Sequence, residues 1–325
     1  MKIGITYDLR TWYLERGFSM EETAEFDKEE TIAAIENVLI SSGFETERIG
    51  NIYQLVKKLA AGAKWDLVFN IAEGMYGDGR ESAVPALLDQ YRIPYVFSGP
   101  VIMGISLNKY FARLVVEASG VPVSPGIIVA HMEDIPKTSC LSFPLFVKPV
   151  AEGTGKGITT RSTVHNFEEL GAICGDLLEK YSQPVLVEEY LPGREFTVGV
   201  VGSGRKSTCI GGMEIICKDG LPYSNEVKEN YKDYVEYIPI EKELWEECSK
   251  VSKDAWVALG GVDAGRIDLK ADRNGKICFI EANPLAGLNP VHSDLPILSG
   301  MSNISYHELI NKIVESAIKR GSNKI

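Results

Sequence analysis

Residues 264–290 read AGRIDLKADRNGKICFIEANPLAGLNP, and this stretch decides the fold. Asn274-Gly275 predicts a two-residue β-hairpin loop, because a type I′ turn needs positive φ at both of its central positions. With that loop, Asp268 and Glu281 lie opposite one another, since each stands six residues away from it. Side chains alternate between the two faces of a strand. Four apolar residues are therefore expected on the core face: Ile267, Leu269, Ile280 and Ala282.

The opposed carboxylates on the other face indicate a cation site. Directly opposed Cβ atoms lie about 4.5–5.5 Å apart, and like charges there destabilise a sheet. Arg266 and Asn283 form a second pair on the same face. Oxygen ligands from Asp, Glu and Asn suit Mg²⁺, which proteins usually bind together with substrate phosphates. The alternative is a surface hairpin with one unfavourable pair that Arg266 relieves.

The composition is typical of a globular protein with two or three domains. The 325 residues are 45% hydrophobic and 24% charged, and a formal net charge of −11 argues against a general nucleic-acid surface. The six cysteines show no C-x-x-C spacing and are interpreted as reduced, buried thiols. The N-terminal MKIGITYD indicates a strand rather than a signal peptide, and no apolar run approaches the roughly 18 residues of a membrane span. We therefore expect a cytoplasmic protein without membrane contact.

The order of the predicted elements indicates an α/β fold in three units, residues 1–108, 109–191 and 192–325. Strand and helix patterns alternate along the first unit, which predicts a parallel α/β domain. Its elements are strands at 2–8, 66–72 and 94–99 and helices at 31–42 and 83–90. The second unit has helices at 109–119 and 167–181 and strands at 143–149, 157–163 and 185–191. The third has strands at 195–203 and 209–216, a helix at 244–259, the hairpin, and a last helix at 306–318. Parallel sheets bind ligands beyond the carboxyl ends of their strands, where residues 8–10 and 72–74 are expected.

A glycine-rich loop, Glu152-Gly153-Thr154-Gly155-Lys156-Gly157, stands between two predicted strands. Glycines let backbone N–H groups approach phosphates closely, and the Thr154 hydroxyl adds a donor. Lys148 ends the apolar strand just upstream, where a lone charge needs an anionic partner. These features predict a phosphate site, with an ordinary glycine-rich hairpin as the alternative. Lys109, at the start of a predicted helix, is by itself typical of a solvated surface.

A second candidate ligand segment is VLVEEYLPGREF, residues 185–196. Glu188 and Glu189 end an apolar strand, and Glu195 follows the turn. A strand end offers backbone donors and acceptors to a flat base, and carboxylates nearby suit an exocyclic amine or ribose hydroxyls. The segment is consistent with a nucleoside site and equally with a charged hinge.

Together these segments resemble the ATP-grasp superfamily and, within it, the D-alanine–D-alanine ligase family. The most specific matches are FPLFVKPVAEGTGKGI at 143–158, VEEYLPGREFTVGV at 187–200, and residues 265–290 of the hairpin stretch. The resemblance implies an α+β ATP-grasp fold, in which an N-terminal parallel α/β domain precedes two subdomains that sandwich ATP. It also implies an ATP- and Mg²⁺-dependent carboxylate–amine ligase. In that reaction ATP phosphorylates the carboxylate of one amino acid, and the amine of another displaces the phosphate.

On the nucleotide side, the resemblance implies a role for each matching residue. The phosphates would be held by Lys109, Lys148 and the loop residues Gly153, Thr154 and Gly155. Glu188 would meet the adenine amine, backbone groups of Glu189 and Leu191 would meet the base edge, and Glu195 would hold the ribose. The expected ligands of two Mg²⁺ ions, with Mn²⁺ as an alternative metal, are Asp268, Glu281 and Asn283.

On the amino-acid side, four residues match. Arg266 would stabilise the transferred phosphoryl group, and Lys228, in a lid over residues 222–237, would reach the γ-phosphate. Glu25 would bind the ammonium of the first amino acid, and Ser293 the carboxylate of the acceptor. Thr154, where the family carries a serine, would act beside them.

Departures from the family pattern also fall on the amino-acid side. Glu229 stands where the family carries a lid tyrosine, with Tyr231 as the alternative if the alignment is shifted, and Glu73-Gly74 replaces its His-Gly. The added negative charge predicts a more cationic substrate than D-alanine, or one with an additional amine or hydroxyl. The expected partners are small amino-acid or peptide substrates, with a homodimer as the candidate assembly and peptidoglycan biosynthesis as the candidate pathway. The alternatives are a ligase for a different amino-acid or small-peptide pair, and a non-ligating ATP-grasp kinase or nucleotide-binding protein.

Overall fold

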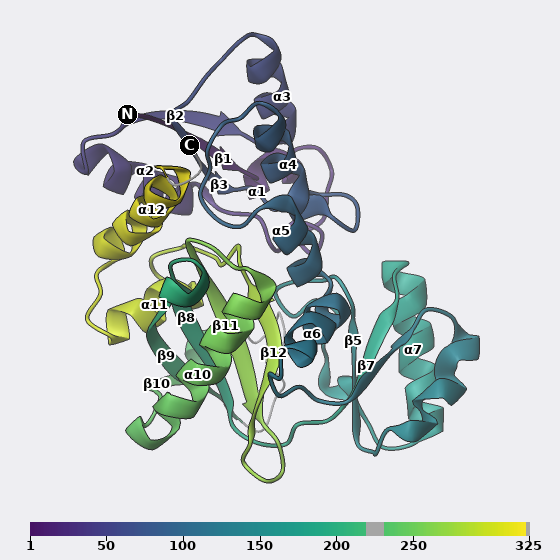
Figure 1. Ribbon diagram of the computed structural model, residues 1–325. Coiled ribbons are helices and arrows are strands. Elements are labelled where there is room, and N and C mark those ends of the chain that lie inside the picture. The colour runs from purple at the N-terminus through teal and green to yellow at the C-terminus, as the bar shows by residue number, and fades with distance from the viewer. Residues whose placement is uncertain (219–230, 323–325) are drawn as a thin grey trace.

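The computed structural model describes residues 1–218 and 231–322, which form three β-sheets (Figure 1). The first sheet is parallel with order β2-β1-β3. The second has order β4-β7-β5-β6, the third has order β10-β9-β8-β11-β12, and both are antiparallel. Helices pack against all three sheets, which confirms the predicted α/β class with a parallel N-terminal sheet. None of the helices in these two ranges is long and apolar enough to cross a membrane.

The parallel sheet lies within residues 1–108. Its strands are β1 (Lys2–Tyr7), β2 (Glu45–Gly50) and β3 (Leu67–Ile71), and the accompanying helices are α1 (Arg10–Leu14), α2 (Glu29–Ser41), α3 (Ile52–Ala60), α4 (Ala83–Gln90) and α5 (Pro100–Leu107). Strand β2 was not predicted, because its residues ETERIG carry no apolar alternation. The predicted strand at 94–99 is wrong, since only Tyr95 bridges to β3. Phe97 has a φ of +71° and donates its N–H to Asp263, which takes the chain out of the sheet.

The C-terminal helix α12 (Tyr306–Ser322) returns to this sheet and packs against α2 (Figure 1). Leu309, Ile310 and Ile313 lie in one apolar core with residues of β1 and α2. Burial of apolar surface therefore holds the C-terminal helix α12 against the N-terminal parallel sheet and its helix α2.

The second sheet presents one face to a helix and the other to a cavity. Its strands are β4 (Gly126–Val129), β5 (Leu145–Pro149), β6 (Thr163–Val164) and β7 (Val185–Glu189), and its helix is α7 (Phe167–Tyr181). Val147 and Val187 pack under α7, so the alternating residues Lys148 and Glu188 face the cavity. The predicted strand at 157–163 is wrong, because the turn Thr160–Ser162 interrupts it. Thr159 and Ser162 bond to local backbone there, which competes with strand pairing.

The third sheet carries the hairpin. Its strands are β8 (Glu195–Val201), β9 (Thr208–Cys217), β10 (Val235–Pro239), β11 (Ala264–Ala271) and β12 (Ile277–Asn283); its helices are α9 (Tyr231–Tyr234), α10 (Lys242–Leu259) and α11 (Asp294–Met301). The fully buried Trp256 of α10 and Val116 of α6 (Lys109–Ala118) pack on Ile267 and Phe279. One face of the hairpin is therefore core, and the other is open to ligands.

The hairpin loop differs from the prediction, but the carboxylate pair does not. Asp272 pairs with Lys276, and its side chain accepts from Asn274 N–H, so the loop has three residues, Arg273–Gly275, with Gly275 at φ +84°. This shifts the register by one residue, and a bulge at Ile280 shifts it back. Asp268 consequently pairs with Glu281, and Arg266 with Asn283, as predicted.

The bulge changes the environment of Ile280. The expectation that it lies on the core face is wrong, because it is half-buried and lines the cavity beside Glu281. Phe279 takes the core position instead.

Candidate active site

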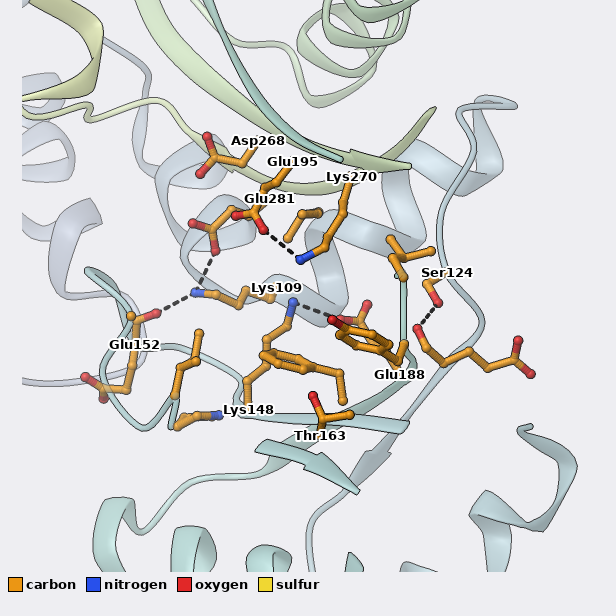
Figure 2. Close-up of a pocket in the computed structure, with 18 of the residues that line it drawn as sticks. Lys109, Ser124, Lys148, Glu152, Thr163, Glu188, Glu195, Asp268, Lys270 and Glu281 are labelled. Atoms are coloured by element: carbon orange, nitrogen blue, oxygen red, sulfur yellow. Dashed lines mark hydrogen bonds and ion pairs between the residues drawn. The ribbon is translucent and has the colours of Figure 1, made fainter. Parts of the chain in front are cut away.

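A cavity separates the second sheet from the third (Figure 2). We call it the first cavity. Its charged lining residues are Lys109, Lys148, Glu152, Lys156, Glu188, Glu189, Glu195, Asp268, Lys270 and Glu281. They come from α6, β5, the glycine-rich loop, β7, β8, β11 and β12, so residues far apart in the sequence meet here.

Two buried lysines in this cavity are each paired with a carboxylate. Lys148 Nζ lies 2.8 Å from Glu188 Oε2, and Lys109 Nζ lies 3.2 Å from Glu281 Oε2 (Figure 2). Lys109 also donates to the carbonyl of Glu152. Both lysines are at most 8% exposed. Ammonium groups this deeply buried are well suited to hold phosphate oxygens, because the cavity screens charge less than water does.

The first cavity also contains Lys270, which was not predicted from the sequence. Its Nζ lies 2.8 Å from Glu195 Oε2 and 5.7 Å from the centre of the Tyr190 ring. Burial alone would lower the pKa of Lys270, but the charge of Glu195 and the hydrogen bond to it raise the value. Strand alternation could have identified Lys270, because it stands two residues after Asp268 and so shares its face of the strand.

The strand-end residues expected at the base edge also line the cavity. The backbone N–H of Glu189 donates to Pro125 O, and its carbonyl accepts from Ser124 Oγ at 2.6 Å. That carbonyl oxygen keeps a second lone pair for a ligand. Leu191 completes this edge.

The glycine-rich loop is fixed to the N-terminal unit through Glu25. The N–H of Gly153 donates to Glu25 Oε1 at 2.7 Å, and a Cβ on this glycine would come within 2.6 Å of the same oxygen. Thr154 at φ +49° and Gly155 at φ +72° turn the loop over the cavity edge.

Glu25 is itself held by two cations. Arg80 Nη2 lies 3.1 Å from Glu25 Oε2, and Lys156 Nζ lies 3.4 Å from Oε1. Burial would raise the pKa of Glu25, but the charges of Arg80 and Lys156 outweigh burial and lower it. No local pattern in the sequence identifies Arg80.

At the hairpin, each of the opposed carboxylates is compensated by a cation of the chain. Asp268 accepts from Thr197 Oγ1 at 2.7 Å and lies 2.9 Å from Arg266 Nε. Asn283 Nδ2 lies 3.2 Å from Asp268 Oδ2, and Glu281 pairs with Lys109. Three oxygen-bearing side chains are thus grouped at one end of the cavity.

A second cavity adjoins the first, and three residues line both: Lys109, Glu152 and Glu281. The predicted amino-acid-side residues Glu25, Glu73, Thr154, Arg266 and Ser293 line the second cavity, together with the predicted metal ligand Asn283. The lid residues Lys228 and Glu229 lie outside the described residues. The structure therefore brings the remaining predicted residues together around two connected cavities.

Comparisons with known proteins identify the family. A family model described as D-ala D-ala ligase C-terminus matches residues 115–315. The D-alanine–D-alanine ligase of Lacticaseibacillus casei is 33% identical over 260 residues, which cover 78% of this chain and 68% of the relative. That of Aquifex aeolicus is 32% identical over 256 residues, covering 77% of this chain and 82% of the relative.

Solved structures agree on the fold. The D-alanine–D-alanine ligase of Bacillus anthracis complexed with ATP superposes with a TM-score of 0.74 at 21% identity, over 100% of both chains. The VanG D-Ala:D-Ser ligase of Enterococcus faecalis gives a TM-score of 0.74 at 19% identity, over 97% of this chain and 99% of that one. With a family model that spans most of the sequence and an ATP-grasp architecture around paired lysines and carboxylates, this chain belongs to the D-alanine–D-alanine ligase family of ATP-dependent carbon–nitrogen ligases.

Proposed function

We propose that this chain joins the carboxylate of one amino acid to the amine of another, through an acyl phosphate made from ATP. The observation that carries the proposal is the junction of the two cavities at Lys109, Glu152 and Glu281. A nucleotide in the first cavity would direct its terminal phosphate to this junction. A carboxylate bound in the second cavity would then lie in reach of the phosphoryl group, held for attack.

Mg²⁺ fits the residues at the hairpin. Among the described residues, no three His, Cys, Asp or Glu side chains gather as a metal site, so a ligand set must draw on Asn283 beside Asp268 and Glu281. Carboxylate and amide oxygens are the donors that Mg²⁺ prefers, with phosphate oxygens completing the set. Bound Mg²⁺, two ions by the family pattern and replaceable by Mn²⁺, would neutralise charge on the phosphates.

The remaining roles follow the positions of the side chains. Lys109 and Lys148 would hold phosphate oxygens, with Gly153, Thr154 and Gly155 covering them. Glu188, Glu189, Leu191 and Glu195 would hold adenosine. Arg266 would stabilise the phosphoryl group and the tetrahedral intermediate, and Glu25 would order the loop and the first amino acid. The proposal also includes domain limits at 108/109 and 191/192, a cytoplasmic location and a homodimer. It further includes contact between Lys228 and the γ-phosphate.

The test is release of ADP from ATP and Mg²⁺ with pairs of amino acids, single amino acids or none, together with mass spectrometry of the products. We expect ADP release and a new dipeptide mass only when a carboxylate donor and an amine acceptor are both present. ADP release at full rate without a dipeptide would instead identify a kinase. No ADP release with any pair would mean a nucleotide-binding protein without ligase activity.

Ser293→Ala is expected to raise the KM for the acceptor amino acid while leaving the KM for ATP nearly unchanged. Ser293 Oγ accepts from Asn289 N–H at 3.0 Å, so its own hydroxyl hydrogen is available to a ligand in the second cavity. Loss of one such bond to a carboxylate weakens binding by about 1–3 kcal/mol. Steady-state kinetics with each substrate varied in turn measures both constants.

Ser302→Ala, a serine at the other end of α11, is the matched control and should leave both constants unchanged. Equal increases in the two KM values, or a change in melting temperature alone, would mean that Ser293 stabilises its turn and does not bind the acceptor.

A further inference from the structure

One wall of the second cavity carries carboxylates without cationic partners. Glu73 follows the carboxyl end of β3, and Glu81 lies in the turn Arg80–Ser82 before α4. Both side chains are half-buried and line the cavity, and neither has an ion-pair partner among the residues that the structure describes.

Three other carboxylates around the same cavity each contact a cation. Glu25 contacts Arg80 and Lys156, Glu281 contacts Lys109, and Asp294 contacts Arg266. At the wall that Glu73 and Glu81 form, by contrast, no ion pair within 4.0 Å joins either carboxylate to a cation of the described residues. A carboxylate removed from water without a cation is costly, which makes this wall a place where a ligand cation gains binding free energy.

Ser106 in α5 gives an independent indication of a ligand. This serine is 5% exposed and lines the same cavity, and among the described residues its hydroxyl has no hydrogen-bond partner. A helical serine usually bonds to the carbonyl four residues earlier. The turn that holds Glu81 packs directly on α5, with Ser82 Oγ donating to Pro100 O at 2.7 Å. The hydroxyl and the carboxylates therefore belong to one wall.

The pKa of each of the two carboxyls is raised, as expected for a buried carboxyl with too little positive charge beside it. Burial, followed by the charges of Glu81, Glu25 and Asp27, raises the pKa of Glu73 well above its ordinary value. Burial is also the largest cause that raises the pKa of Glu81 to about 7, against the lowering effect of Arg80. An ammonium group bound between them would favour the charged form of both.

We propose that Glu73, Glu81 and Ser106 bind the side-chain ammonium of a diamino acid, which is one of the two substrates of the ligation. This inference rests on the proposed ligase function and names the substrate class of that site. The ammonium would be held by charge-assisted hydrogen bonds to both carboxylates and by the hydroxyl oxygen. The α-carboxylate of the same molecule would extend toward Lys109 and Arg266, which line the same cavity.

The test compares amino acids that differ only in the side-chain amine. Lysine and ornithine are matched with norleucine and norvaline, each as D and L forms and each paired with itself and with alanine. We expect kcat/KM for ADP release to favour the diamino acid by about tenfold or more, the value of one to two hydrogen bonds to a charged group. Calorimetric binding to the protein with Mg²⁺ and a non-hydrolysable ATP analogue should show the same preference.

Glu73→Gln and Glu81→Gln should each remove most of this preference, and Ser106→Ala should reduce it in the same direction. The matched control is Glu179→Gln, an exposed carboxylate on α7 far from both cavities, which should leave the preference intact. Without amino acids, the two cavity variants should melt at or above the temperature of the unmodified protein, because each removes a carboxyl whose ionisation burial opposes.

The outcomes separate this inference from the ligase proposal. Ligation of neutral amino acids as fast as of their diamino counterparts would overturn the inference and leave the ligase function standing. No ligation, but preferential calorimetric binding of lysine that Glu73→Gln abolishes, would support the ammonium site and reject the ligase. Lower melting temperatures with unchanged preference would give the two carboxylates a structural role and overturn it.

Discussion

Asp268→Asn and Glu281→Gln are each expected to lower the rate of ADP release by about 100-fold or more at saturating ATP. Both substitutions keep the shape of the side chain and remove one negative charge from the proposed Mg²⁺ ligands. The charge that develops on the phosphoryl group then loses part of its compensation. The measurement is kcat as a function of Mg²⁺ concentration, where the half-saturating concentration should also rise.

The fold should tolerate both changes. Opposed carboxylates in register repel one another, so removal of one relieves repulsion. Arg266 keeps its contact with Asp294, and Lys109 keeps the carbonyl of Glu152. Glu247→Gln is the matched control, because Glu247 accepts from Ile277 N–H in the same hairpin but lies outside both cavities. Near-normal turnover in both hairpin variants would contradict the assignment of Asp268 and Glu281 as Mg²⁺ ligands.

The prediction of this carboxylate pair was right, although the loop behind it was wrong. Asn274-Gly275 has the composition of a two-residue turn, but Asp272 accepts from the N–H groups of Asn274 and Lys276 and stabilises a three-residue loop. The bulge at Ile280 restores the register. Local sequence cannot give such a bulge, because it forms where Phe279 packs into the core while Ile280 and Glu281 face the cavity.

Strand alternation predicted more of the first cavity than of the second. Lys148 and Glu188 reach the first cavity because they alternate with apolar residues of the same strands. The same rule would have found Lys270. Arg80 and Glu25 are different, since 55 positions separate them and neither stands in a periodic pattern. Their ion pair is set by how the turn before α4 meets the segment between α1 and α2, which is a tertiary contact.

Arg320→Met is expected to destabilise the protein by about 3–5 kcal/mol at neutral pH, with little direct effect on the cavities. Arg320 Nη2 in α12 lies 2.6 Å from Oδ2 of Asp263, which is fully buried ahead of β11. The same carboxylate accepts from Phe97 N–H at 2.9 Å, so it joins the N-terminal unit, the third sheet and the last helix. Methionine keeps the apolar stem but leaves a buried carboxylate without its cation. Urea denaturation at constant pH measures the loss.

The pH dependence of this loss distinguishes a buried charge from simple loss of packing. Burial, only partly offset by Arg320, already raises the pKa of Asp263 above 3.8 in the folded state. Without Arg320 the folded-state pKa rises further, so the folded variant binds a proton that the unfolded chain releases, and its stability increases as the pH falls. We therefore expect the difference from the unmodified protein to shrink between about pH 7 and about pH 5. Lys319→Met, next to it on the exposed face with an ion pair of 3.4 Å to Glu315, should change stability by less than about 1 kcal/mol at either pH. A loss in Arg320→Met that stays constant with pH would mean that packing, and not the unpaired carboxylate, sets the stability of this junction.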